Sequence, residues 1–368
     1  MQAIPVSQSS EEVLLAAIAG NTTPDVCSNI WPGALHDYTQ AGGLIVLDEF
    51  PDFDSVASAR TPRDLLETFR SPDGHFHQLP WKTNPIMMFY NRRLLQEAGV
   101  DYVPRTYSEY LNAGAKVSRD TSGDGRIDIW MGERDIRPIW WQRLMDFYPF
   151  YIAASGGRTL FENGDVAFEN KAAESVLSFF QECYSRRYFP MTFFQGGDPF
   201  VLERKATHFS GPWHVAQIKK FAPHLDFGVS HLPVPDDHEG PVYTSGDFKN
   251  ISVFSNTKHP TEAWEFVKFL VRPEHDLLLL EIGNQIPIRG DLLSNPLFAD
   301  YFCRNPTMVS FADQAVFTRG MDTVPDLKEI FDVISQEYEI CALYGRKNPV
   351  DAVRDAARRA RFIVEWNQ

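Results

Sequence analysis

Aromatic residues in this sequence stand where short apolar segments end. Trp213 follows a Gly-Pro turn at residues 211 and 212, and Trp31 follows the apolar segment 26–30. Such a turn can present an indole ring at a surface, where its apolar face packs well against the C–H face of a sugar ring. Without further context, however, a tryptophan is more often a core residue. Both residues are therefore candidate stacking groups with a structural alternative.

Several polar residues are candidates for binding the hydroxyl groups of such a ligand. They are Asn84, Asp146, Tyr148, Gly246, Asp247 and Arg289. Ligand sites combine aromatic surface with a few directed polar groups, which fix the orientation of the bound molecule. Taken singly, each of these residues is as readily a solvated or capping residue. Asp247 is the strongest candidate because it follows Gly246 at the end of a turn-rich stretch.

Two short motifs contain potential metal ligands. Residues 120–128 read Asp-Thr-Ser-Gly-Asp-Gly-Arg-Ile-Asp, with oxygen ligands at alternate positions and glycine at the sixth, as in a calcium loop. The twelfth position is Met131 instead of a bidentate glutamate, so a hydrogen-bonded surface turn is the preferred interpretation. His75 and His77 would share one side of an extended segment, but no third ligand is evident. We therefore expect no metal site.

The common motifs of catalysis and nucleotide binding are missing from the sequence. It contains no GxGxxG, GxxxxGK[ST], HExxH or GxSxG pattern. We therefore expect no catalytic residues and no cofactor. The alternative is a carbohydrate-active enzyme similar to a glycoside hydrolase, because acids and aromatic residues also line the clefts of such enzymes.

Composition limits the class of protein further. The 368 residues exceed a single core of ordinary size, so two domains are expected. A net charge of −14 disfavours a nucleic-acid partner. No apolar run approaches the roughly 20 residues that span a bilayer. Four widely spaced cysteines, without a CxxC pair, indicate neither a zinc site nor a redox motif.

Local patterns predict alternating strands and helices. Ser9 and Glu12 have the spacing of a capping box, and a helical apolar pattern then runs to Gly20. Apolar segments at 3–6 and 26–30 flank this helix, which predicts a β-α-β unit and a parallel sheet.

Two further helices are marked by prolines. Pro260 and Pro273 are suited to first helical positions. The helix that starts at Pro273 should end at Gly283, a residue typical of a C-terminal cap. The Pro- and Gly-rich stretch 233–246 is the best candidate for a crossing between domains.

A series of motifs in fixed order extends along nearly the whole chain. It includes a "YN…L…AG…P.T..E" run over residues 90–109, Ala-Ser-Gly-Gly at 154–157 and Phe-Glu-Asn at 168–170. The series continues with Gly-Pro-Trp at 211–213, Phe-Gly-Val at 227–229, Leu-Pro-Val-Pro at 232–235, Ala-Trp-Glu-Phe at 263–266 and Pro-Ile-Arg at 287–289. In this order the sequence resembles the family 1 extracellular solute-binding proteins, relatives of maltose-binding protein.

The resemblance implies an α/β, two-lobed periplasmic-binding-protein fold with hinge strands crossing between the lobes. Lobe I would comprise residues 1–85 and 248–308, and lobe II residues 86–247 and 309–368. The ligand would be held in the cleft and enclosed by hinge bending. Family members carry a signal peptide, a strand and a helix ahead of the point where this chain begins, so we expect the upstream sequence to encode them.

The implied function is capture of a mono- or oligosaccharide for a bacterial ABC importer. The partners would be the sugar and the membrane subunits of the permease, and the protein would act as a monomer. Its location would be periplasmic or extracellular, with a lipid anchor as one arrangement. A phosphorylated sugar or an amino sugar stays open as an alternative ligand.

Overall fold

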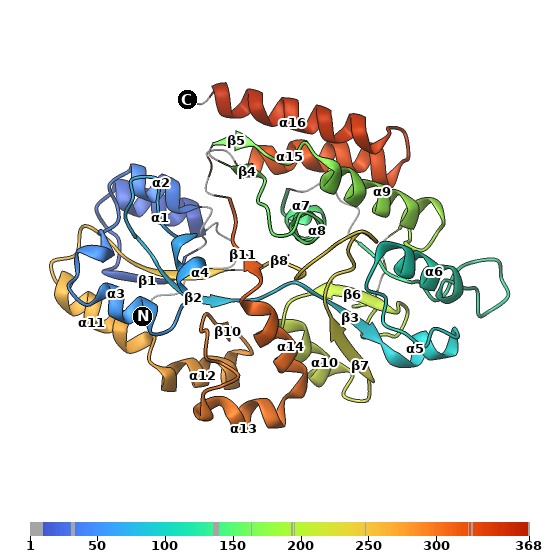
Figure 1. Cartoon of the computed structure of the whole chain (residues 1–368), viewed down its shortest axis with the longest axis horizontal. Coiled ribbons are helices and arrows are strands. Elements are labelled where there is room, and N and C mark those ends of the chain that lie inside the picture. The colour runs from blue at the N-terminus through green and yellow to red at the C-terminus, as the bar shows by residue number, and fades with distance from the viewer. Residues whose placement is uncertain are drawn as a thin grey trace. The chain divides into compact units, whose positions relative to one another are not determined.

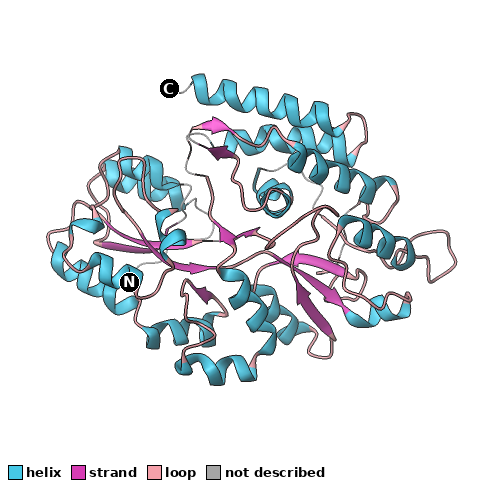
Figure 2. Ribbon diagram, viewed as in Figure 1, coloured by secondary structure: helices cyan, strands magenta, loops and turns pink. Residues whose placement is uncertain are grey.

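The computed structural model describes residues 10–30, 34–134, 140–162, 164–192, 194, 196–246, 248–322, 324 and 327–366 (Figure 1). The chain folds into two compact units. Unit 1 comprises residues 1–84, 247–306 and 320–325, and unit 2 comprises residues 85–246, 307–319 and 326–368. Each unit consists of short strands flanked by helices (Figure 2).

Unit 1 is built on an antiparallel sheet with the strand order β1-β9-β2-β10. Its strands are β1 (Val26–Ile30), β9 (Lys249–Val253), β2 (Leu79–Thr83) and β10 (Ile286–Pro287). The central strand β9 pairs with both β1 and β2, and it comes from the part of the chain that returns to unit 1 after residue 246. The sheet therefore joins segments more than 160 residues apart in sequence.

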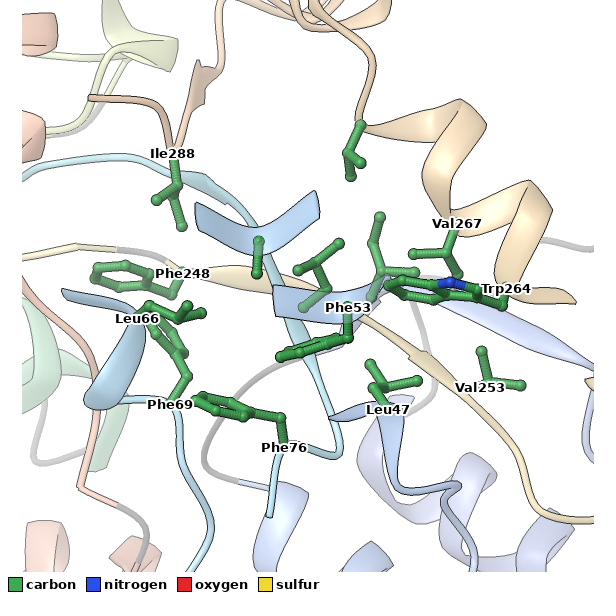
Figure 3. Packing of buried hydrophobic residues seen from close by; sticks show 14 of the residues in the cluster. Leu47, Phe53, Leu66, Phe69, Phe76, Phe248, Val253, Trp264, Val267 and Ile288 are labelled. Carbon is green, nitrogen blue, oxygen red and sulfur yellow. The ribbon is translucent and has the colours of Figure 1, made fainter. Parts of the chain in front are cut away.

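An aromatic core holds this sheet against the helices of unit 1 (Figure 3). Trp264 of helix α11 (Pro260–Leu270) stacks on Phe50 at 5.1 Å and packs near Phe53 of α3 (Phe53–Ser58) at 6.0 Å between ring centroids. Its indole N–H donates to Asp52 over 2.7 Å, so the polar end of the buried ring is satisfied. Burial of each large side chain stabilises the unit by about 1.5–3 kcal/mol.

The other helices of unit 1 are short. They are α1 (Ser10–Ala19), α2 (Leu35–Gln40), the 3-10 helix Leu47–Glu49, α4 (Arg63–Glu67), α12 (Pro273–Gly283) and α13 (Pro296–Arg304). The predicted helices that begin at Pro260 and Pro273 are confirmed, because their prolines occupy the first turn, where a missing N–H costs nothing.

Unit 2 contains a three-stranded antiparallel sheet of order β6-β3-β7 and two smaller pairs. The strands are β3 (Met87–Asn91), β6 (Thr207–Ser210), β7 (Phe227–Ser230), the hairpin β4 (Phe161–Glu162) and β5 (Asp165–Val166), and the parallel pair β8 (Thr244–Ser245) and β11 (Thr318–Arg319). Strand β3 starts directly after the boundary at residue 84, so this sheet begins where the chain first enters unit 2.

Unit 2 contains more helical than strand residues. They are α5 (Arg92–Glu97), α6 (Tyr107–Val117), α7 (Trp140–Met145), α8 (Phe147–Ala154), α9 (Lys171–Ser185), α10 (Trp213–Phe221), α14 (Pro306–Ala315), α15 (Leu327–Tyr338), a π-helical turn Glu339–Leu343 and α16 (Pro349–Trp366). A capping box begins α6: Thr106 accepts from the backbone of Glu109, and the Glu109 carboxylate accepts in return from Thr106.

Helix α16 has an alanine-rich face that is buried and a charged face on the other side. Its buried face carries mainly alanines, among them Ala352, Ala356 and Ala360, which allow close packing on α15 and α9. The arginines lie on the other side: Arg354 pairs with Asp351 and Arg358 with Asp355, both one turn away. This basic group is therefore a solvated helix face.

The described sheet of unit 1 is antiparallel and not parallel as expected, because β1 pairs with the returning strand β9. The predicted strand 3–6 lies outside the described residues, so its pairing with β1 stays a prediction. Helix α12 ends at Gly283 as predicted, but the residue in the left-handed conformation is the following Asn284 (φ 47°). Among the described residues, no helix has the length and apolar character needed to cross a membrane.

Candidate functional site

Trp213 is the first residue of α10, immediately after the turn that ends β6. Its ring folds back over Gly211, where a Cβ atom would lie 2.1 Å from the indole Cζ3, so this turn requires glycine. The side chain is only partly buried, unlike the core tryptophan Trp264, which is 2% exposed. The geometry therefore leaves indole surface available for a ligand.

Asn84 is the last residue of unit 1 before the chain enters unit 2. It is buried, and its amide donates to Oε1 of Gln285 over 2.7 Å. Its carbonyl Oδ1 is buried without a hydrogen-bond partner in the described part of the chain. A buried acceptor of this kind is rare in native proteins and can accept a hydrogen bond from a ligand hydroxyl.

Gly246 ends the first passage of the chain through unit 2. It forms an antiparallel bridge with Pro85, and its N–H donates to the carbonyl of Arg319 over 3.1 Å. The predicted crossing at 233–246 thus lies within unit 2, and the boundary follows at residue 247.

A second aromatic group near Gly246 was not predicted from the sequence. The Tyr243 ring lies over Gly157, where a Cβ would be 2.9 Å away, and the guanidinium of Arg319 lies 4.2 Å above the same ring. Gly157 has a φ of +94°, which a residue with a side chain rarely adopts. The Gly-Gly pair at 156–157 is the sequence signal that could have located this group.

Asp146 lies in a buried ion cluster of unit 2. Its carboxylate accepts from Nε of Arg134 over 2.5 Å and also from Arg143. Asp146 is 0% exposed, and both arginines are buried. The predicted ligand contact is therefore occupied by two guanidinium groups. The neighbouring Tyr148 is also fully buried, with its ring edge-on to Phe331 at 5.7 Å.

Arg289 lies in a similar buried ion cluster in unit 1. Its Nη1 donates to Asp276 over 3.2 Å, and its Nε donates to Asp291 over 2.7 Å. Asp276 in turn accepts two bonds from Arg60, at 3.0 and 3.1 Å. The hydrogen bond from Arg289 lowers the pKa of Asp291, so this pair stays charged. Arg289 therefore holds structure within its own unit.

Trp31 and Asp247 lie outside the described residues, so their predicted roles stay predictions. Trp213, Gly246, Asp146 and Tyr148 belong to unit 2, and Asn84 and Arg289 to unit 1.

The segment 120–128 forms an exposed turn closed by its own hydrogen bonds. Asp120 accepts from the backbone of Ser122, Gly123 and Gly125 at 2.7–3.0 Å. These bonds, first those from Gly125 and Gly123, lower the pKa of Asp120. The two histidines of the other motif contact separate carboxylates: His75 lies 3.1 Å from Asp48, and His77 lies 2.8 Å from Asp73.

The four cysteines are free thiols. Burial raises the pKa of Cys27 to about 11, so its thiol stays protonated at neutral pH.

Sequence comparison identifies the family. The model of the family described as bacterial extracellular solute-binding protein matches residues 2–303. The chain belongs to this family. An arabinooligosaccharide-binding protein of Halalkalibacterium halodurans is 23% identical over 314 residues, which are 80% of this chain and 65% of that protein.

Solved structures share the fold of this solute-binding protein. An uncharacterised protein from Listeria monocytogenes has a TM-score of 0.88 and 26% identity, covering 98% of this chain and 91% of that one. The sugar-binding protein MalE from Xanthomonas citri has a TM-score of 0.81 and 20% identity, covering 100% and 90%. The predicted family and the two-lobed α/β periplasmic-binding-protein fold are confirmed.

Proposed function

We propose that this solute-binding protein captures a mono- or oligosaccharide and delivers it to the membrane subunits of an ABC importer. The observation that carries the proposal is Trp213, a partly exposed indole on a glycine turn at the start of a helix. The names of the Halalkalibacterium relative and of the Xanthomonas protein refer to sugars, which supports this ligand class.

We propose contacts in each unit, taken by itself. In unit 2, Trp213 would stack on the sugar ring, and the Tyr243 and Arg319 pair near Gly246 would add a second aromatic face and a cation. In unit 1, Asn84 would accept a hydroxyl through its unpartnered Oδ1. Trp31 and Asp247 remain proposed sugar contacts on the basis of the sequence alone. Tyr148, Asp146 and Arg289 are left out because each is held in the interior of its unit.

The proposal also covers location and activity. The family is extracellular, and we place this protein outside the cytoplasmic membrane, free or on a lipid anchor, as a monomer. It would bind its sugar without converting it and without a cofactor. Sustained release of products from an oligosaccharide would instead support a glycoside hydrolase.

Native mass spectrometry of protein purified without refolding tests the ligand class directly. A co-purified mass that matches a sugar supports the proposal, and a mass that contains phosphate or an amino group selects the alternative ligands. A panel of sugars measured by calorimetry then gives the affinity.

Replacing Trp213 with alanine tests the site. Loss of the stacking surface should weaken sugar binding by about 1.5–3 kcal/mol, which is roughly ten- to a hundredfold, while the melting temperature without sugar changes little.

Two other tryptophans serve as matched controls. Trp264→Ala should destabilise the core of unit 1 by about 3–5 kcal/mol without a specific loss of affinity in the folded fraction. Trp366, which is 77% exposed, should tolerate alanine in both measurements. If Trp213→Ala behaves like Trp264→Ala, the ring is structural and the proposed site is wrong.

A further inference from the structure

Three side chains in unit 2 gather in a way that the sequence analysis did not predict. Asp198 lies in a loop before β6, His208 lies on β6, and His214 lies in the first turn of α10. One ligand atom from each residue lies within 4.8 Å of the other two. In the part of the chain that the structure describes, this is the one group of three acids, histidines or cysteines so close together.

The short connection between β6 and α10 produces this arrangement. The turn at Gly211 and Pro212 reverses the chain, so that the two imidazole rings face each other with their centroids 4.2 Å apart. Phe89 packs edge-on against His214 at 5.0 Å, and Phe200 stacks on His208 at 5.9 Å. An aromatic ring therefore packs against each imidazole.

His214 has a nitrogen without a partner. Its Nδ1 lies 3.1 Å from Oε1 of Gln217 and 3.6 Å from the Asp198 carboxylate. Its Nε2 is buried without a hydrogen-bond partner among the described residues, and the residue is 1% exposed. A buried imidazole nitrogen in this state lacks the interaction that such groups normally make.

Charges of both signs surround the group. Lys205 lies 2.9 Å from Nδ1 of His208 and 3.0 Å from the carboxylate of Glu133. Asp198 and Glu133 carry negative charge, and Lys205 and Arg134, which both act electrostatically on His208, carry positive charge.

We propose that Asp198, His208 and His214 form a binding site for one transition-metal dication of the zinc type. Two imidazoles and a carboxylate are ligands that zinc accepts in sites with an open fourth position. Tetrahedral bonds of about 2.1 Å place ligand atoms about 3.4 Å apart, so the three side chains close in by about an ångström when the metal binds. Asp198, with 18% of its side chain exposed, offers an entry path.

The metal would link the loop before β6 to the first turn of α10. This link would hold in place the turn at residues 211–212, which precedes Trp213. The metal site itself does not depend on sugar binding, so its failure and the failure of the proposed function are separate results.

The test uses the full chain, stripped with chelator and titrated with Zn²⁺ by calorimetry and with Co²⁺ by visible absorption. We expect one equivalent of zinc per chain, and the intense visible bands of tetrahedral cobalt. Absence of one-to-one binding in the wild-type protein would overturn the proposal without any variant.

Variants then locate the metal. Asp198→Asn and His208→Gln should weaken zinc binding by more than about tenfold. Lys205→Met keeps all three ligands and removes the nearby positive charge, so it should bind zinc more tightly. Asp198 lies on a loop, so replacing it should disturb the folding of the core less than replacing His208 on β6.

The matched control is His224→Gln, because the side chain of His224 is 72% exposed and lies outside the group. This variant should bind zinc as the wild-type protein does. The double variant His75→Gln/His77→Gln removes the other histidine pair and should also leave binding unchanged. If zinc affinity follows His224 or the 75/77 pair and not Asp198 and His208, the proposed site is wrong.

Discussion

Each unit contains a fully buried aspartate that pairs with two arginines. In unit 2, Asp146 pairs with Arg134 and Arg143, and Arg143 also contacts Ser335. In unit 1, Asp276 pairs with Arg60 and Arg289, and Arg289 also pairs with Asp291, an aspartate that is partly exposed. The two clusters differ because, among these contacts, one arginine of unit 1 has a second aspartate beside it.

This difference matters because buried charges are costly to leave unpaired. Taking an ion out of water costs several kcal/mol, and the partner charge offsets that cost only while it is present. Removal of the shared aspartate should therefore damage unit 2 more than unit 1. Arg134 would keep its bond to the carbonyl of Met145 and Arg143 its bond to Ser335, but both are neutral acceptors.

The largest effect is expected for Asp146→Ala. It leaves two buried guanidinium groups without their carboxylate and should reduce the free energy of unfolding of unit 2 by about 3–5 kcal/mol. Hydrogen exchange followed by mass spectrometry should show the loss in α7, α8 and α15, with the strands of unit 1 unaffected.

An apolar replacement of the whole cluster is the control for this prediction. The triple variant Arg134→Met/Arg143→Met/Asp146→Leu removes all three charges and should recover most of the stability, as well-packed apolar substitutes often do. If the triple variant is as unstable as Asp146→Ala, shape and not charge determines the loss.

A smaller effect is expected for Asp276→Ala. Arg60 would keep the carbonyls of Pro80 and Trp81, and Arg289 would keep Asp291. We expect a loss of about 3 kcal/mol, at the lower end of the range for a broken buried pair. The variant Asp276→Ala/Asp291→Ala also removes the second carboxylate beside Arg289. It should lower the free energy of unfolding by more than the sum of the two single changes. Simple additivity in urea unfolding would contradict the shared role of Asp291.

The fold could be predicted where local patterns and ordered motifs determine it. Proline at a first helical position marked Pro260 and Pro273, and the ordered motifs identified the family. Strand direction could not be predicted, because the partner of β1 is β9, more than 200 residues away. The 26–30 segment has the same composition whether its neighbour is parallel or antiparallel.

The candidate site was harder to predict because a residue type does not reveal its partner. Asp146 and Arg289 have the chemistry of ligand contacts, but each faces an opposite charge inside its own unit. The group of Asp198, His208 and His214 spans 17 residues and is assembled by a turn, so no standard ligand spacing in the sequence indicates it. Trp213 could be proposed because its Gly-Pro turn is local and visible in the sequence, and its role stays a prediction.

The smallest effect is expected for Asp120→Asn, an exposed aspartate of unit 2 held by backbone amides instead of arginines. The backbone amides of Ser122 and Gly123 donate to Oδ1 of Asp120, and the amide of Gly125 donates to Oδ2. Asparagine has only one acceptor oxygen, so it cannot accept all three bonds. At neutral pH the variant should melt slightly lower, by less than either buried aspartate variant.

The pH dependence of that difference separates the exposed carboxylate from the buried ones. The folded-state pKa of Asp120 is depressed, so its contribution is fully present above the unfolded pKa of about 3.9. It is lost as the pH falls through the lower folded value and the carboxylate is protonated. The melting temperatures of wild type and Asp120→Asn should therefore converge below about pH 4. A difference that persists undiminished in acid would show that the loop needs the shape of aspartate and not its charge, and the contrast with the arginine-held carboxylates would then fail.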